Sequence, residues 1–370
     1  MTKSALAILA VISVITLVLT VVLLRQHSDS YDESKKYSPA TEPPKTNVSR
    51  EPLRFPLLTG GPKDDLFYQP RVAATSPDGQ LYIMDKWGAV RAFSDTGERL
   101  ANWSMPYVTS GEGVKGLPEA IAFDSDGTVI IADTHYGRVL FFQPDGRPLP
   151  EKTIGREGRD NGEFCYPSGL ALDRVRRRLY VSEYGWNDRI QVFDLDSRTH
   201  IRTIGRRGIG LVEFDRVAAL AFVPLPDGER LYVADAANHR IHVLSPDGQF
   251  IRSIGRFGSR LGELSYPYDI KIYDGLRRRD AACDSAVLDP DSAILCVCEY
   301  GNNRVQFFTL DGEPLAAIGE PGAALGQYFS PWAIGITSSG ELIVTDTDNH
   351  RLQNAGRVMD IVSAARAARK

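Results

Sequence analysis

The sequence predicts an all-β protein, a six-bladed β-propeller of four-stranded blades that is preceded by one transmembrane helix. A short apolar strand that ends in an acid recurs along the 370 residues. Self-similarity with a period of about 50 residues is typical of propellers, in which each copy forms one blade. Turn signals recur in the same order in every copy, and one long apolar run precedes them all. The repeats therefore indicate one closed array rather than several domains.

Residues 1–25 are predicted to form an N-terminal transmembrane anchor. Residues 5–24 carry no charge and are rich in Leu, Ile and Val, a length that crosses the bilayer core as a helix. No Ala-x-Ala-like cleavage site follows Leu24, so an uncleaved anchor is favoured over a cleaved signal peptide. We expect a single-pass membrane protein whose propeller is extracytoplasmic, either periplasmic or extracellular. The many Arg and Ala residues suggest a bacterial source.

Residues 26–51 are predicted to form a flexible stalk. They are polar and rich in Ser, Asp, Glu, Lys and Pro, a composition that cannot bury a core. The propeller itself is expected over residues 52–355.

Each copy of the repeat predicts four short antiparallel strands. A Gly-rich loop such as 155–164 is followed by a Pro that opens the first strand, and Arg216 is assigned to that place in the fourth copy. An Asp-Gly turn leads to the second strand, which ends at the acid. A loop of a few residues, a third strand, another Asp-Gly turn and a fourth strand complete the blade.

The sixth copy lacks the signals for a fourth strand after Gln353. Residues 52–59 resemble a fourth strand, so we expect them to complete blade six from the N-terminal side and to close the ring without a covalent bond. Pro56 suits an outermost strand, which leaves some N–H groups unpaired. Residues 356–370 are expected to be a basic tail, either a short helix or a frayed end.

The order of acid, Asn-His-Arg-Ile and Asp-Gly resembles the NHL repeat. The segments that carry this resemblance are 235–241, 346–352 and 299–305, with weaker copies at 133–139 and 183–190. The resemblance implies a propeller of six NHL-like four-stranded blades. It does not imply one function, because NHL-like propellers include ligand- and protein-binding sensor domains, RNA-binding domains and a peptide-amidating lyase.

An acid and an Arg bracket the loop between the second and third strands in copies two to six. A guanidinium group can hold a carboxylate and loop carbonyls in fixed geometry. A catalytic group is expected once rather than five times, so the pairs are interpreted as a structural clamp. The first copy lacks the Arg after Asp85. The pairs are Asp133 with Arg138, Glu183 with Arg189, Asp235 with Arg240, Glu299 with Arg304, and Asp346 with Arg351.

Aromatic side chains that differ between copies are the best candidates for ligand binding, because residues that vary are not needed to build a blade. The loops that carry them emerge on the same face of a propeller, where aromatic side chains suit a peptide or glycan. The alternative is that they pack between blades. The candidates are Trp87, Tyr136, Tyr184, Trp186, Tyr300 and Trp332.

His135, His239 and His350 lie in the same set of loops, in blades two, four and six. Three imidazoles that converge on a channel would bind Zn²⁺ with an open position for water. Equivalent places around a six-bladed ring are far apart, so structural or surface roles are favoured. No cofactor is predicted, and Zn²⁺ or Ca²⁺ belongs only to an enzymatic alternative.

A formal net charge of -4 argues against a nucleic-acid partner. Of the four cysteines, Cys296 and Cys298 lie two apart in a strand and are interpreted as small packed residues. A disulfide from Cys283 to one of them is the alternative.

Together these features predict a membrane-anchored, extracytoplasmic propeller. It would act as a binding, sensor or scaffold module for a protein, peptide or glycan at the loop face, with residues 5–24 in the membrane. The alternative is a metal-dependent lyase or hydrolase with its site at the channel mouth. Whether the protein is an enzyme stays open at this point.

Overall fold

The computed structural model describes residues 67–94, 96–106, 116–274 and 287–368. The expected anchor, the stalk and the closing strand at 52–59 lie outside these residues. Among the described residues, no helix combines the length and the apolar character needed to span a bilayer.

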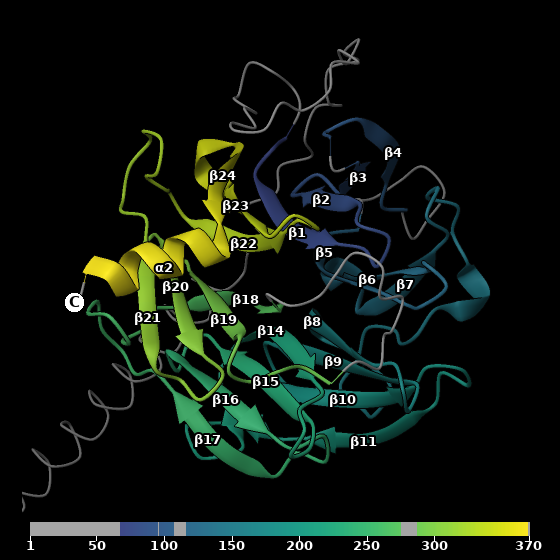
Figure 1. Cartoon of the computed structure of the whole chain (residues 1–370). Coiled ribbons are helices and arrows are strands. Elements are labelled where there is room, and N and C mark those ends of the chain that lie inside the picture. The colour runs from purple at the N-terminus through teal and green to yellow at the C-terminus, as the bar shows by residue number, and fades with distance from the viewer. Residues whose placement is uncertain (1–66, 95, 107–115, 275–286, 369–370) are drawn as a thin grey trace, which may run out of the picture. The chain divides into compact units, whose positions relative to one another are not determined.

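Six antiparallel sheets lie around a common centre within the described part of the chain, one for each sequence copy (Figure 1). The first strand of every sheet is innermost, and each first strand contacts those of the neighbouring sheets. The period of the sequence therefore correctly predicted a six-bladed propeller.

The strands of the six blades follow chain order. Blade one contains β1 (Pro70–Thr75), β2 (Leu81–Asp85), β3 (Ala89–Phe93) and β4 (Arg99–Ser104), and blade two contains β5 (Pro118–Phe123), β6 (Val129–Asp133) and β7 (Arg138–Phe142). Blade three contains β8 (Tyr166–Asp173), β9 (Arg178–Tyr184), β10 (Arg189–Asp194) and β11 (His200–Ile204), and blade four contains β14 (Val217–Val223), β15 (Arg230–Asp235), β16 (Arg240–Leu244) and β17 (Phe250–Ile254). Blade five contains β18 (Pro267–Asp274), β19 (Ala293–Glu299), β20 (Arg304–Thr309) and β21 (Pro314–Ile318), and blade six contains β22 (Pro331–Ile336), β23 (Glu341–Asp346) and β24 (Arg351–Arg357).

Blade two departs from the pattern at its outer edge. Instead of a regular fourth strand, Pro148 and Ile154 form isolated bridges to β7, and a 3-10 turn, η3 (Pro150–Lys152), separates them. Proline has no N–H to donate to the ladder, so two prolines in this short segment prevent continuous pairing.

A helix, α2 (Val358–Ala368), follows β24 and occupies most of the expected basic tail. Val358 and Val362 are fully buried in a cluster that includes Leu315 and Ala316 of β21. Helix α2 therefore covers apolar surface of blades five and six.

The apolar core lies between adjacent blades rather than within one sheet. Cys296 and Cys298 of β19, for example, pack against Ile334 and Val344 of blade six. Cys165, Cys296 and Cys298 are free thiols, as the packing interpretation of Cys296 and Cys298 requires. Cys283, the proposed alternative partner, lies outside the described residues.

Blades six and one are joined directly. The Thr347 hydroxyl donates a hydrogen bond of 2.6 Å to the carbonyl of Pro70, and the Thr75 hydroxyl donates one of 2.6 Å to Ile336. Thr134 of blade two makes the same bond to Pro167 of blade three, also at 2.6 Å. The ring is thus closed by contacts among the described residues.

The assignment of Arg216 to the proline position was wrong. Val217 pairs with Asp235 in the register in which Pro70 pairs with Asp85, so Val217 occupies the place of the proline. Arg216 lies one residue earlier, at a position with positive φ in several blades: Gln69, Arg216, Tyr266 and Ser330. This shift brings the Arg216 side chain to the centre of the ring.

Candidate ligand site at the centre of the propeller

The acid–Arg pairs form a repeated clamp on the Gly-rich loops. In blade five, Arg304 Nε donates to Glu299 at 2.6 Å, while its Nη atoms donate to the carbonyls of Ser259, Arg260 and Glu263. The second oxygen of Glu299 accepts the Ser265 N–H at 2.8 Å. One ion pair thus fixes both ends of the loop that enters the blade.

The other predicted pairs have the same geometry, with Nε-to-carboxylate distances of 2.6–2.8 Å. They join Arg138 to Asp133, Arg189 to Glu183, Arg240 to Asp235 and Arg351 to Asp346. Every acid in the set is fully buried. Burial raises the pKa of Asp133 and Glu183, and hydrogen bonds from the paired Arg oppose that rise.

Blade one also has a clamp, which the sequence pattern did not reveal. Arg91 Nη1 lies 2.8 Å from Asp85 Oδ2, although Arg91 lies two positions farther along its strand than the other clamp arginines, which pair directly with their acids. Arg91 pairs with Ile83 across the sheet, the place that Gln306 takes in blade five. Its guanidinium group reaches the acid from that neighbouring position.

Two of the three loop histidines, for which a metal site was only the alternative, hold adjacent blades together. Nδ1 of His239 accepts the Tyr266 N–H at 3.1 Å, and Nδ1 of His350 accepts the Gln69 N–H at 3.3 Å. Asn303 and Asp188 accept the equivalent N–H groups of Ser330 and Arg216. Backbone positioning therefore accounts for these two rings.

The third candidate, His135, lies in η2 (Thr134–Tyr136) beside the ring of Tyr136. Within the described residues, no three or more His, Cys, Asp or Glu side chains are arranged to hold a metal ion. The structure does not bring the three histidines together, and the donor set does not fit a Zn²⁺ site.

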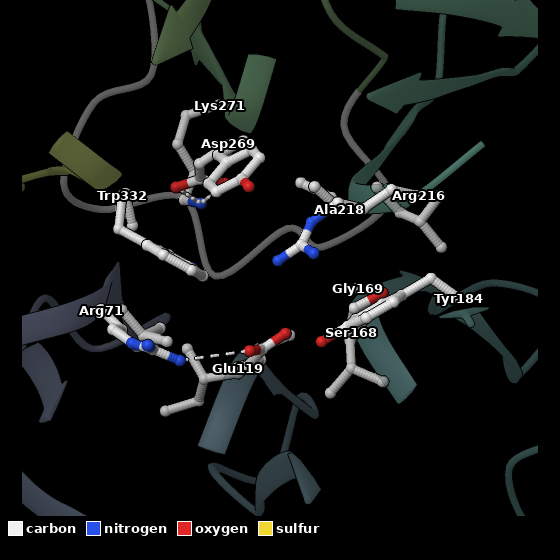
Figure 2. Close-up of a pocket in the computed structure, with 18 residues that line it drawn as sticks. Arg71, Glu119, Ser168, Gly169, Tyr184, Arg216, Ala218, Asp269, Lys271 and Trp332 are labelled. Carbon is white, nitrogen blue, oxygen red and sulfur yellow. Dashed lines mark hydrogen bonds and ion pairs between the residues drawn. The ribbon is translucent and has the colours of Figure 1, made fainter. Parts of the chain in front are cut away.

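A central cavity lies where the six first strands meet, and it is lined from every blade (Figure 2). Its volume is about 50 Å³. A cavity of that size holds about three or four water molecules. A larger ligand would therefore place only one small group inside it.

Arg216 lies against two tyrosine rings of the cavity wall. Its guanidinium carbon lies 4.7 Å from the ring centroid of Tyr184 and 5.1 Å from that of Tyr268. Figure 2 shows the guanidinium pointing into the cavity from the blade-four side. Cation–π contacts with two rings hold this charge at the centre of the propeller.

A second arginine enters from blade one, on the opposite side of the ring. Arg71 lies over the Trp332 ring at 4.2 Å and 3.4 Å from Glu119 (Figure 2). Both charged side chains of this pair are almost fully buried. Arg71 Nε has no hydrogen-bond partner in the described part of the chain.

Asp269 and Lys271 of β18 form a third charged group. The Lys271 ammonium lies 2.6 Å from both Asp269 oxygens, and Asp269 Oδ2 also accepts the Ile334 N–H. Burial raises the pKa of Asp269, and the ammonium of Lys271 opposes that rise. Three cations, Arg71, Arg216 and Lys271, and two acids, Glu119 and Asp269, give the lining a net charge of +1.

Three of the six predicted aromatic residues are brought together at this site. Tyr184 and Trp332 line the cavity. Tyr300 stacks on Tyr268 with centroids 4.7 Å apart and contacts the edge of Trp332. Tyr268, which was not among the six, links the others.

The remaining three aromatic residues do not line the cavity. Trp186 is 66% exposed and lies under Arg159, and Trp87 stacks on Tyr68. Tyr136 lies beneath the clamp residue Arg138.

The charged lining residues Arg71, Glu119, Asp269 and Lys271 and the central Arg216 were not predicted. A signal for part of the set does exist, since Arg71 and Glu119 each follow the proline that opens a first strand. The residues at that position differ in every blade: Arg71, Glu119, Ser168, Ala218, Tyr268 and Trp332. Comparing the copies at this position would have located the cavity wall.

The fold and this site define a class of protein, the six-bladed β-propellers with a polar, aromatic-lined centre. Residues 330–353 match the family model for the NHL repeat. Blade six thus carries a match to the NHL repeat, within a six-bladed β-propeller.

Part of the chain is similar to peptide-amidating enzymes. It is 29% identical over 168 residues to peptidylglycine alpha-amidating monooxygenase of Rattus norvegicus, and 27% identical over 171 residues to peptidyl-glycine alpha-amidating monooxygenase A of Xenopus laevis. Each match covers 43% of this chain but only 17% and 18% of those proteins. The chain therefore spans less than a fifth of the length of these relatives.

Solved structures share the fold at low sequence identity. An auxiliary nutrient binding protein from Bacteroides ovatus superposes with a TM-score of 0.55 at 13% identity, covering 80% of this chain and 71% of that one. The corresponding values for a protein of the same description from Bacteroides thetaiotaomicron are 0.55, 14%, 79% and 70%. At this level of identity the likeness shows the fold alone.

Proposed function

We propose that this propeller is a binding module that holds an anionic group of its ligand in the central cavity. The body of the ligand, a protein, peptide or glycan, lies against the aromatic side chains of the loop face. On this proposal the module is a sensor or scaffold, anchored by residues 5–24 and extracytoplasmic.

The observation that carries the proposal is the position of Arg216 between two tyrosine rings. An arginine at the centre of a small cavity with a net charge of +1 favours a planar anion, and a carboxylate matches the two donors of a guanidinium edge. The aromatic residues around it offer flat apolar surface beside the charge. The small volume restricts the bound group to one the size of a carboxylate.

The proposal is tested with paired small probes and Trp fluorescence. N-acetylglutamate and galacturonic acid should bind to the full chain, while N-acetylglutamine and galactose should not. Arg216→Ala should abolish the response, and the matched control Arg156→Ala, which removes an exposed loop arginine, should keep it. Equal binding of the charged and neutral probes would contradict the proposal.

A second candidate is a metal-dependent lyase or hydrolase, favoured by the similarity to the amidating enzymes. The ligands expected from the sequence, His135, His239 and His350, do not converge in the described part of the chain, and two of them already accept backbone N–H groups. Metal analysis of the purified chain decides this candidate. Stoichiometric Zn²⁺ or Ca²⁺ that is lost in His135→Ala or His239→Ala would replace the binding-module proposal.

A further inference from the structure

The Gly-rich loops of blades four, five and six present large apolar side chains to solvent. The loops are 205–214, 255–264 and 319–330. They lie at the end of the propeller that also carries the loops between the second and third strands of each blade. We call the apolar residues the apolar rim. They are Ile209, Leu211, Phe257, Leu261, Leu325 and Phe329, of which Ile209 is 79%, Phe257 69% and Leu325 67% exposed.

The apolar rim is not required by the clamp that builds these loops. Loop 155–164 of blade three has the same clamp, with Arg189 bound to the carbonyls of Arg159 and Asp160. That loop carries no large apolar side chain at its tip. Asn161 lies three residues before the buried Phe164. In the other loops the third residue before the equivalent buried side chain is a leucine: Leu211, Leu261 or Leu325.

The loops hold the apolar side chains outward on a fixed backbone. Arg240 binds the carbonyls of Ile209 and Gly210, and Arg304 binds those of Ser259 and Arg260. Refolding these loops would break the hydrogen bonds from the clamp arginines to the loop carbonyls. An exposed apolar set of this kind marks an interaction surface.

Exposed arginines accompany the apolar rim. The side chains of Arg206 and Arg256 are 81% and 80% exposed. Loops 205–214, 255–264 and 319–330 carry four arginines and three glutamates, a net charge of +1, whereas the whole chain carries -4. The four arginines are Arg206, Arg207, Arg256 and Arg260.

We infer that the apolar rim docks on an anionic lipid bilayer. Each of the three loops carries two exposed apolar side chains, and loops 205–214 and 255–264 also carry arginines. This combination suits a membrane interface, where apolar groups enter the acyl boundary and cations meet phosphates. A protein partner would instead need matching pockets for each tip. The inference goes beyond the proposed function, since it does not depend on the ligand of the central cavity.

The chain that precedes the described residues supports this choice of partner. Residues 5–24 have the length and composition of a membrane anchor. An anchor at residues 5–24 would tether the chain to a bilayer and so raise the effective concentration of lipid at the apolar rim. The polar loop 155–164 leaves the blade-three side of the loop face open to water, so a ligand still reaches the centre.

The test uses the full chain reconstituted in vesicles that contain phosphatidylglycerol with brominated acyl chains. Leu325→Trp places a reporter on the apolar rim, and Val175→Trp places one on the exposed turn between β8 and β9, at the opposite end of the blade. Bromine quenches only those indoles that enter the acyl region. Leu325→Trp should lose about twofold more fluorescence than Val175→Trp, because both share one tether and differ only in the face they occupy.

A second variant set keeps the test decisive. Leu211→Trp replaces Leu325→Trp if that protein does not fold. In the reporter variant, one of Leu211, Leu261 and Leu325 is already Trp, and the remaining two leucines are then changed to Asn, the residue that blade three has at this position. These changes should remove the extra quenching while the circular dichroism spectrum stays unchanged. Equal quenching at the two faces, or quenching that survives the Asn changes, overturns the inference and assigns the apolar rim to a protein partner or to solvent.

Discussion

The Nε2 atom of His242 lies 3.5 Å from the Oδ2 atom of Asp235, at a position where three other blades place glutamine. In blade five, the equivalent Gln306 donates to Glu299 and to the Glu263 carbonyl and accepts the Gly262 N–H. Both ring nitrogens of His242 are buried without a hydrogen-bond partner among the described residues. Blade four therefore lacks a bonding pattern that its neighbours have.

His242→Gln should increase the free energy of unfolding by about 1 kcal/mol, because the amide can donate to Asp235 and to the Glu213 carbonyl. Urea unfolding followed by circular dichroism measures the change. The converse variant, Gln306→His, should lower the stability. A lower stability for His242→Gln would show that the imidazole contributes more through packing than the amide would through hydrogen bonds.

Arg304→Ala should destabilise the protein by about 3 kcal/mol, since it leaves the buried Glu299 carboxylate without its partner. Arg304→Lys should fall between this variant and the wild type, because an ammonium cannot reach the carboxylate and the loop carbonyls together. Arg256→Ala, on the exposed side of the same loop, is the control and should change stability by less than about 0.5 kcal/mol. Differential scanning calorimetry distinguishes the three outcomes.

Arg91 should matter as much as a clamp arginine, although the sequence pattern places none there. Arg91→Ala is expected to cost about 2 kcal/mol, because Asp85 is only 2% exposed and loses its charged partner. Arg91→Gln should cost less, since Gln306 at the equivalent place binds its own acid. An effect of Arg91→Ala no larger than that of an exposed loop arginine would exclude a clamp in blade one.

Asp188 should make stability fall as the pH rises. Burial raises the pKa of Asp188 from 3.8 to about 6. Between these pH values the folded protein binds the proton more tightly than the unfolded chain, so the stability that this group contributes at low pH is lost as the pH passes about 6. Asp188→Asn copies Asn303 of blade five and should remove this slope.

At pH 7, Asp188→Asn should be more stable than the wild type by about 2–3 kcal/mol. Unfolding curves measured at several pH values for both proteins isolate the contribution, because the other buried acids are shared. Parallel pH profiles for the two proteins would show that Asp188 does not titrate in this range.

The fold could be predicted because each blade repeats the same local signals. Prolines, Asp-Gly turns and the acid mark strand ends independently of tertiary contacts, and six copies keep the same phase. The proline position failed in blade four, where no proline is present and a bulge separates Val217 from Ala219. The other five blades have an equivalent bulge, so the missing proline alone explains why Arg216 was assigned one place too late.

The site was predicted only in part, because a cavity depends on which side chains meet rather than on which side chains occur. Tyr184 and Trp332 were identified as variable aromatic residues, but their partners Arg216 and Arg71 are contributed by blades on opposite sides of the ring. Trp186 was a candidate for ligand binding, but it is exposed and lies against Arg159 rather than at the cavity. Comparing the copies in the sequence identifies the residues that vary, but only the structure shows which of those residues lie close together.

The hydrogen bond from Thr347 to Pro70 repeats the bond from Thr134 to Pro167, and His350 binds Gln69 as His239 binds Tyr266. The interface between blades six and one, the seam of the ring, is therefore built from the same hydrogen bonds as the interfaces between blades two and three and between blades four and five. Mechanical or thermal opening has no preferred starting point at this seam, and a circular permutant opened at another surface turn should retain the same set of joints.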